Sequence, residues 1–130
     1  MALMEFREPN QVKWVGSRPA HNGTQLTAVK VVTDAEGTIY TVPVGETLFL
    51  CSMNAVIPVV AAGTVFMNIY TDAAAVYFYG MQESILAAQG GIYRYFTFWP
   101  PMELPSSYYI RIGSGAAGLT VRASIFGWVE

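Results

Sequence analysis

The strongest candidate for chemistry is a glycine-rich stretch, Gly113-Ser-Gly115-Ala-Ala-Gly118, which has the G-x-G-x-x-G spacing of a dinucleotide-binding loop. That chemistry needs a helix after the loop, whose N-terminus holds the pyrophosphate, and an acidic residue about 20 positions further on. Here the loop leads into Leu119-Thr-Val-Arg-Ala-Ser-Ile, in which apolar and polar residues alternate as in a strand. We therefore predict a hairpin loop and no cofactor.

Titratable and nucleophilic residues are few. The chain has one histidine, His21, and one cysteine, Cys51. A Ser-His-Asp triad, a Cys-His pair or a zinc site needs such residues to converge, and His21 lies in a polar segment before a turn signal. Residues 34–37 could touch a calcium ion but lack further oxygen ligands at regular spacing, so we expect a solvated turn. We predict no catalytic residue, no metal site and no enzyme activity, with Cys51 as a small buried hydrophobic residue.

Aromatic residues offer a binding chemistry instead. Sugars are held by flat ring faces together with a few polar groups. Trp99, Tyr108 and Tyr109 flank the proline-rich stretch 100–105, which could form one rim of a domain. Rings at strand ends more often fill a core or a subunit seam. A glycan-binding rim at Trp99, Tyr108 and Tyr109 therefore stays open as an alternative.

The elements that position these residues are predicted to be strands. From Ala28 onward, short β-rich segments alternate with turn residues at spacings of about 8 to 12, as in a sandwich or jelly roll. The segment 82–89 is the only candidate helix, although a loop fits it nearly as well, and 100–107 is expected to form a long irregular link. The predicted strands are 28–33, 38–42, 47–54, 56–60, 64–70, 75–79, 92–99, 108–112 and 119–129. We predict an all-β, jelly-roll-like antiparallel sandwich of about 8 strands over residues 28–130, preceded by an extended N-terminal arm at 1–27.

Charge content excludes two classes of partner. Charged residues make up 12% of the chain, about half the share in an average soluble domain. Residues 1–30 carry four basic and two acidic side chains, whereas residues 31–130 carry three basic and seven acidic ones. An acidic body lacks the clustered Lys and Arg of a nucleic-acid surface. The uncharged stretch 47–71 is long enough to span a membrane, but Pro58, Gly63 and many β-branched residues favour buried strands. We expect neither nucleic acid nor membrane as a partner.

The scarcity of charge suggests that part of the surface is covered by another subunit. In the segments 92–99 and 119–129, bulky rings occur on faces that should point away from the core. Rings on both faces of a sheet indicate that both faces are covered, and in a sandwich only one face meets the partner sheet. The residues predicted to be buried against another subunit are Phe96, Phe98, Phe126 and Trp128.

Three stretches resemble small β-sandwich structural proteins of tailed bacteriophages. They are Ile39-Tyr-Thr-Val-Pro-Val-Gly-Glu-Thr-Leu-Phe-Leu, the segment Pro100-Pro101-Met-Glu-Leu-Pro105 before Tyr109-Ile-Arg-Ile, and the closing Leu119-Thr-Val-Arg-Ala-Ser-Ile-Phe-Gly-Trp-Val-Glu130. Such proteins open with a Y-x-V-P-x-G strand-turn and carry a proline-rich segment before the penultimate strand. A Gly-aromatic pair near an acidic end closes them. The resemblance covers about residues 38 to 130.

This resemblance implies a virion location and a jelly-roll subunit, usually a homotrimer. It implies a capsid decoration (cement) protein or a module of a head or tail fibre, bound to the major capsid protein or another virion protein. No catalytic residues come with the resemblance. The basic arm would then contact the capsid through Arg7, Lys13, Trp14 and Arg18. The alternative is a bacteriophage fibre or receptor-binding module that holds glycans at its aromatic rim.

Overall fold

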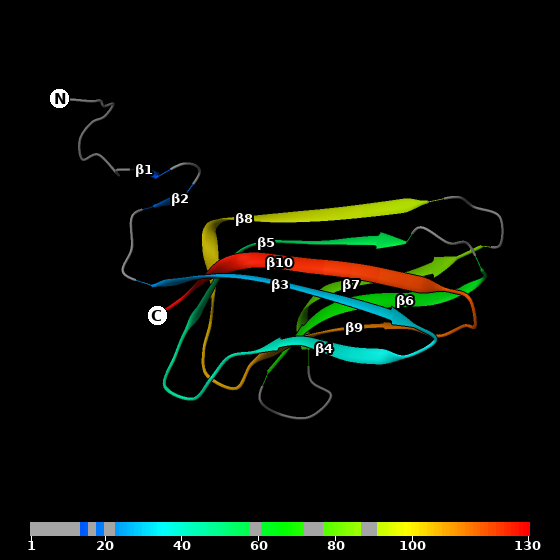
Figure 1. The fold of residues 1–130 in the computed structure, drawn as a ribbon, viewed down its shortest axis with the longest axis horizontal. Coiled ribbons are helices and arrows are strands. Elements are labelled where there is room, and N and C mark those ends of the chain that lie inside the picture. Colours follow the sequence, from blue (N-terminus) through cyan, green and yellow to red (C-terminus); the bar gives the residue numbers. More distant parts are fainter. Residues whose placement is uncertain (1–13, 16–17, 20–22, 58–60, 72–76, 87–90) are drawn as a thin grey trace.

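The computed structural model describes residues 14–15, 18–19, 23–57, 61–71, 77–86 and 91–130. Within these ranges the chain forms strands and no helix (Figure 1). The strands are β1 (Trp14–Val15), β2 (Arg18–Pro19), β3 (Thr24–Thr33), β4 (Glu36–Thr41), β5 (Leu48–Ile57), β6 (Gly63–Tyr70), β7 (Tyr77–Ile85), β8 (Ile92–Leu104), β9 (Tyr109–Ser114) and β10 (Thr120–Val129). The short β1 and β2 pair with each other.

The other strands form two four-stranded antiparallel sheets that pack as a sandwich. One sheet has the order β3-β10-β5-β8 and the other has the order β4-β9-β6-β7. Most consecutive strands lie in opposite sheets, and β6 and β7 are the only consecutive pair of the two sheets that are hydrogen-bonded neighbours. This is the strand order of an eight-stranded jelly roll. The prediction of an all-β, jelly-roll-like antiparallel sandwich is confirmed.

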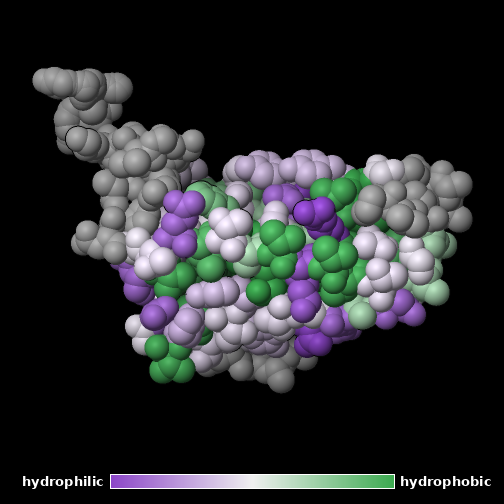
Figure 2. Space-filling model, in the orientation of Figure 1, coloured by the Kyte–Doolittle hydropathy of each residue, from purple (hydrophilic) through white to green (hydrophobic). Residues whose placement is uncertain are grey.

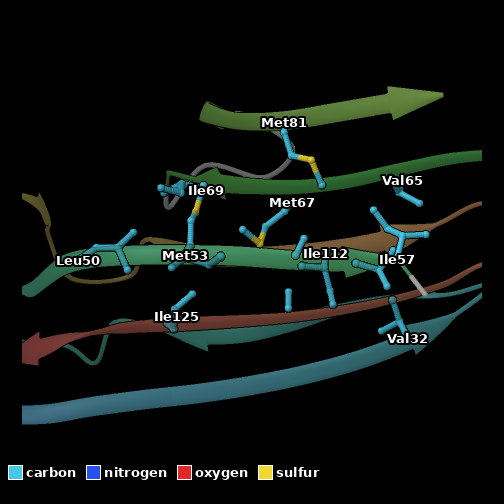
Figure 3. Packing of buried hydrophobic residues seen from close by; sticks show 14 of the residues in the cluster. Val32, Leu50, Met53, Ile57, Val65, Met67, Ile69, Met81, Ile112 and Ile125 are labelled. Atoms are coloured by element: carbon cyan, nitrogen blue, oxygen red, sulfur yellow. The ribbon is translucent and has the colours of Figure 1, made fainter. Parts of the chain in front are cut away.

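The core lies between the two sheets and is built from alternate side chains of each strand. In Figure 3, Met53 and Ile57 of β5 point toward residues of the facing sheet such as Met67 and Ile112. Burying each such side chain stabilises the fold by about 1.5 to 3 kcal/mol. The largest fully buried side chains are Val42, Leu48, Leu50, Met53, Ile57, Met67, Ile69, Leu104, Ile110, Ile112, Leu119 and Ile125.

The predicted helix at 82–89 is wrong where the structure describes it. Residues 82–85 belong to β7, and Met81 and Ile85 are buried while Gln82 and Ser84 are exposed. This alternation has the period of a strand. Pairing with β6 along 63–70 has overridden the local helix propensity of this segment. Residues 87–89 lie outside the described part of the chain.

Two predicted interruptions are strands in the structure. Residues 47–54 and 56–60 were expected as separate strands, but β5 is continuous from Leu48 to Ile57. The predicted irregular link at 100–107 is also wrong over 100–104, because β8 continues to Leu104. Pro100 and Pro101 are tolerated because they lie where the β5–β8 register shifts, between Thr97 and Met102, in an edge strand, so their missing N–H groups leave no ladder bond unmade.

At the N-terminal side, β3 begins at Thr24, so residues 24–27 of the range predicted as arm lie in a sheet. The uncharged stretch 47–71 supplies β5 and β6. Across the described ranges, no helix is long and apolar enough to cross a membrane.

Candidate functional site

The outer surface of the β3-β10-β5-β8 sheet is the best candidate for an interaction site. Cross-strand register places its side chains in rows that run from β3 to β8. We call this surface the β3–β8 face; its rows are Val31-Arg122-Val56-Tyr93, Val29-Ser124-Asn54-Tyr95, Thr27-Phe126-Ser52-Thr97 and Gln25-Trp128-Phe49-Glu103. Only Arg122 and Glu103 are charged among these side chains. A sheet face with so little charge is typical of a surface that meets another protein.

Apolar and aromatic side chains are most exposed at the two edges of this face. On β3, Val29 and Val31 are 53% and 54% exposed, and on β8, Tyr93 and Tyr95 are 56% and 54% exposed. The two tyrosine rings stack with their centroids 6.2 Å apart. The view in Figure 2 shows hydrophobic side chains in separate patches with polar ones between them. The face therefore has two exposed edges on either side of a centre that is more polar and half-buried.

Trp128, predicted to meet another subunit, is already buried within its own chain. It is only 4% exposed, and its ring stacks on Phe49 from β5. The register of β10 with β5 shifts between Phe126 and Gly127, which brings Trp128 opposite Phe49. Gly23 closes over the same ring, since a Cβ there would lie 2.5 Å from Trp128 Cδ1. Trp128 therefore has almost no surface left to bury against a second copy.

The outward orientation predicted for Phe96 and Phe98 is wrong. Both side chains pack against the core between the sheets. Tyr79 of β7 contacts both edge-on, with centroid distances of 6.2 Å to Phe96 and 5.4 Å to Phe98. The rings do alternate along β8, with the phenylalanines as the inward set and the tyrosines as the outward set. Phe126 does lie on the β3–β8 face, where it is half-buried.

The seam between β8 and β7 is closed by an ion pair. Arg94 donates from Nη2 to Glu83 Oε1 at 2.8 Å, and its Nε also donates to the same carboxylate. Both side chains are partly exposed, so the pair is worth at most about 1 kcal/mol. The pair fixes the position of this edge more than it stabilises the fold.

The residues of the predicted glycan rim lie on two different sheets. Trp99 is on β8 and is 59% exposed, whereas Tyr109 is on β9 and stacks on Tyr70, with centroids 5.0 Å apart. Tyr108 precedes β9 and packs against the core. The ring that lies beside Tyr109 is therefore Tyr70, which the sequence reasoning had not singled out.

On the same outer face as Tyr109, Arg111 pairs with Glu36 at 3.0 Å. The Arg111 Nε atom is buried and has no hydrogen-bond partner among the described residues. Phe66 covers Gly113 so closely that a Cβ at Gly113 would collide with the phenyl ring. The ion pair with Glu36 holds the Arg111 guanidinium group beside β4.

The glycine-rich stretch has a structural role. Gly113 and Ser114 end β9, and the following loop leads to β10 in the other sheet, so it is a connection between sheets and not the predicted hairpin. The buried Ser114 Oγ donates to the Leu119 carbonyl at 2.6 Å and accepts from the Asp34 N–H at 2.7 Å. No helix follows the loop, so the requirement of a dinucleotide site is not met.

The remaining candidates for chemistry are dispersed. Cys51, expected to be buried, is partly exposed, because it lies where the pairing of β5 with β8 shifts register. Among the described residues, no group of three or more His, Cys, Asp and Glu side chains could hold a metal ion. His21, Arg7 and Lys13 lie outside the described residues, and for Trp14 and Arg18 only the backbone is described.

Comparison with known protein families and with curated proteins finds no match to this chain.

Proposed function

We propose that this protein is a non-enzymatic structural subunit of a virion, a capsid decoration protein that associates with copies of itself and clamps neighbouring capsid subunits. The observation that carries the proposal is the β3–β8 face, where Val29, Val31, Tyr93 and Tyr95 are exposed and only two side chains are charged. An exposed sheet surface of this composition is stabilised when another protein covers it.

The fold supports the proposal at the level of class. Eight-stranded jelly rolls are frequent among viral capsid proteins and lectins. The same fold hosts unrelated functions, so it adds weight only in combination with the surface and with the bacteriophage resemblance of residues 38–130. The proposed role needs no reacting group, because its work is to hold proteins together.

The mechanism is mechanical. Each Å² of apolar surface buried between subunits contributes about 25 cal/mol, and anything that binds only the folded state raises the apparent stability of the assembly. In this proposal the sandwich supplies self-association, and the basic segment before β3 reaches the capsid. Main-chain pairing of an extended segment with a partner sheet would need few specific side chains.

Deleting residues 1–22 tests whether self-association and capsid binding are carried by different parts of the chain. The deletion stops before Gly23, because this glycine packs against Trp128. We expect the shortened chain to form assemblies with the same number of copies, as measured by light scattering. We expect it to lose binding to purified procapsids in a sedimentation assay. Retained binding to procapsids would contradict the role of the arm.

The competing function is a fibre or receptor-binding module, and a glycan array distinguishes it. Trp99→Ala and Tyr109→Ala are the informative substitutions, with Ser84→Ala as a control at an exposed position of β7, outside both the predicted rim and the β3–β8 face. Specific glycan binding that is lost in the first two variants and kept in the control would replace the decoration role. Absence of glycan binding, together with procapsid binding that depends on the arm, supports the decoration role.

A further inference from the structure

The outer edge of β3 is open to pairing with another chain. β3 is an edge strand of its sheet, where β10 is its only neighbour among the described strands. From Leu26 to Val32, the β3 backbone forms hydrogen bonds with no described residue outside β10. In an edge strand every second residue directs its N–H and C=O groups away from the sheet. This edge therefore presents a row of backbone donors and acceptors to solvent.

The other three edge strands carry interruptions that β3 lacks. β4 has six residues and shifts register between Thr38 and Tyr40. β7 lies beside a register shift at Tyr70, and β8 contains Pro100 and Pro101 at a register shift of its own. Short strands, bulges and prolines are features with which proteins block unwanted pairing at sheet edges. All ten residues of β3 keep one register with β10, and none of them is glycine or proline. β3 is therefore the edge on which an added strand fits best.

Three consecutive exposed side chains define what an added strand would meet. Val29 and Val31 stand on the β3–β8 face and are 53% and 54% exposed. Lys30 stands on the opposite side of β3, beside the buried Ala123 of β10. Side chains of neighbouring strands lie in register on each face of a sheet. An added strand would therefore place alternate residues beside the two valines and the residue between them beside Lys30.

Lys30 sets the chemistry of that middle residue. Its stem extends over the other sheet at Gly37, where a Cβ would lie 2.7 Å from Lys30 Cε. Lys30 is exposed and forms no ion pair within the described part of the chain. An apolar residue beside it would remove water from the ammonium group without replacing it, whereas a carboxylate would pair with it. Lys30 therefore opposes pairing with a wholly apolar strand and favours a strand with an acidic residue at this position.

We infer that β3 accepts an extended segment of another protein as an additional strand, with an acidic residue beside Lys30 and aliphatic residues beside Val29 and Val31. In this mode of recognition, main-chain hydrogen bonds supply affinity and alternate side chains supply specificity. The inference goes beyond the proposed function, in which the segment before β3 reaches a partner. Here the folded domain receives a strand, and each copy can do so whether or not copies associate.

A short peptide tests the inference on the full chain. Its sequence is Thr-Thr-Val-Glu-Val-Thr-Thr, with both ends blocked so that they carry no charge, and a second peptide has lysine in place of the glutamate. Binding is measured by fluorescence anisotropy of the dye-labelled peptides. Lys30→Glu reverses the charge beside the added strand. Arg122→Glu is the matched control, because it makes the same change of charge one strand further in, on the β3–β8 face. Circular dichroism first shows that each variant keeps its β-sheet spectrum.

We expect the unaltered chain to bind the glutamate peptide about tenfold more tightly than the lysine peptide, because opposite charges on neighbouring strands attract and like charges repel. Lys30→Glu should reverse this preference, and Arg122→Glu should change it by less than about twofold, since that charge lies on the other side of the sheet. If Lys30→Glu does not fold, Lys30→Gln replaces it and should reduce the preference to less than about threefold.

Hydrogen exchange shows whether the peptide pairs with the backbone. In the peptide-free protein, every second amide between Leu26 and Val32 should exchange rapidly, because its N–H points away from β10. The glutamate peptide should slow exchange at these amides and leave the amides between them unchanged. This alternating pattern distinguishes strand addition from contact with side chains alone.

Other outcomes overturn the inference. Absence of binding by the glutamate peptide up to about 1 mM would show that this edge does not accept a strand. Equal binding of the two peptides would exclude Lys30 as the selecting residue. Binding without the alternating protection, or binding lost in Arg122→Glu, would assign the peptide to the β3–β8 face. Slow exchange of the same alternate amides in the peptide-free protein would show that a second copy of this chain already occupies the edge.

Discussion

The indole ring of Trp128 lies almost parallel to the phenyl ring of Phe49, with 5.1 Å between ring centroids and 10° between ring planes. The indole N–H donates to the Glu130 carboxylate at 2.9 Å. The backbones of Thr47 and Glu130 exchange two hydrogen bonds beside this pair, at 2.8 and 3.0 Å. This corner of the β3–β8 face is therefore closed by the chain itself, and partners are left with the exposed edges.

Trp128→Ala should destabilise the fold by about 3 to 5 kcal/mol, because it removes a buried ring and leaves a cavity beside Phe49. Urea unfolding at fixed protein concentration measures the change. Val44→Ala is the control, since Val44 is 89% exposed and a surface substitution should change stability by less than about 0.5 kcal/mol. If the Trp128→Ala assembly dissociates while each subunit keeps its stability, Trp128 contributes to the subunit interface and the account is wrong.

Gly127→Ala should destabilise the fold by about 1 to 3 kcal/mol through overpacking. A Cβ at Gly127 would collide with the Phe49 carbonyl and lie 3.1 Å from Leu50 Cα, both of them backbone atoms that cannot rotate away. Gly115→Ala is the matched control, because a Cβ there would lie 3.7 Å from its nearest neighbour, the Thr64 carbonyl. Equal thermal unfolding midpoints for the two variants would show that the register shift in β10 does not require glycine.

Ser114→Ala should cost about 1 to 3 kcal/mol, because it leaves the Asp34 N–H without its side-chain acceptor and the Leu119 carbonyl without its donor. Faster hydrogen exchange at the Asp34 amide would locate the effect. The exposed Ser84→Ala should leave both stability and exchange unchanged. Unaltered exchange at Asp34 in the Ser114 variant would contradict the bridging role.

Alkaline pH should weaken the fold through Tyr40. Burial raises the pKa of Tyr40 above its ordinary value, and the charge of Glu46 raises it further. The folded state then holds the phenolic proton more tightly than the unfolded chain, so this contribution is complete below about pH 10 and is lost as pH rises through the folded pKa. Unfolding midpoints between about pH 8 and 11 should fall less steeply in Tyr40→Phe than in the unaltered chain. Parallel pH profiles would exclude Tyr40 as the source.

A smaller change separates the two causes of the Tyr40 shift. Glu46→Gln should move the Tyr40 pKa part of the way toward its ordinary value, because burial remains while the neighbouring negative charge is removed. Because the chain has eight tyrosines, the Tyr40 pKa is followed by the NMR signal of its ring carbon in ¹³C-tyrosine-labelled protein, assigned by its loss in Tyr40→Phe. Asp34→Asn is a control that removes one acidic charge at an exposed turn. A Tyr40 pKa unchanged by Glu46→Gln would assign the whole shift to burial.

The sequence predicted the class of fold because turns and short β-rich segments alternate regularly after Ala28. Boundaries were less predictable where local preference and sheet pairing disagree. Residues 82–85 favour a helix locally, yet pairing with β6 makes them a strand. Pro100 and Pro101 indicate a loop, but they lie at a register shift in an edge strand, where the strand tolerates them.

The direction of the side chains was harder to predict than the strands. Alternation along β8 separates Tyr93 and Tyr95 from Phe96 and Phe98, but both sets are aromatic, so the pattern alone does not say which set is inside. In β10 the register shift before Gly127 brings Trp128 onto Phe49, and an alternating pattern carries no sign of such a shift. One sign of the outward set is present in the sequence. Tyrosine ends in a hydroxyl group that favours water and phenylalanine does not, so the Tyr93-Tyr95 pair is the set expected outside.

The central claim is that copies of this chain associate through the β3–β8 face. Light scattering of the purified full chain over a range of micromolar concentrations tests it most directly. The account predicts three times the mass of one chain, independent of concentration. A stable monomer across that range would contradict it.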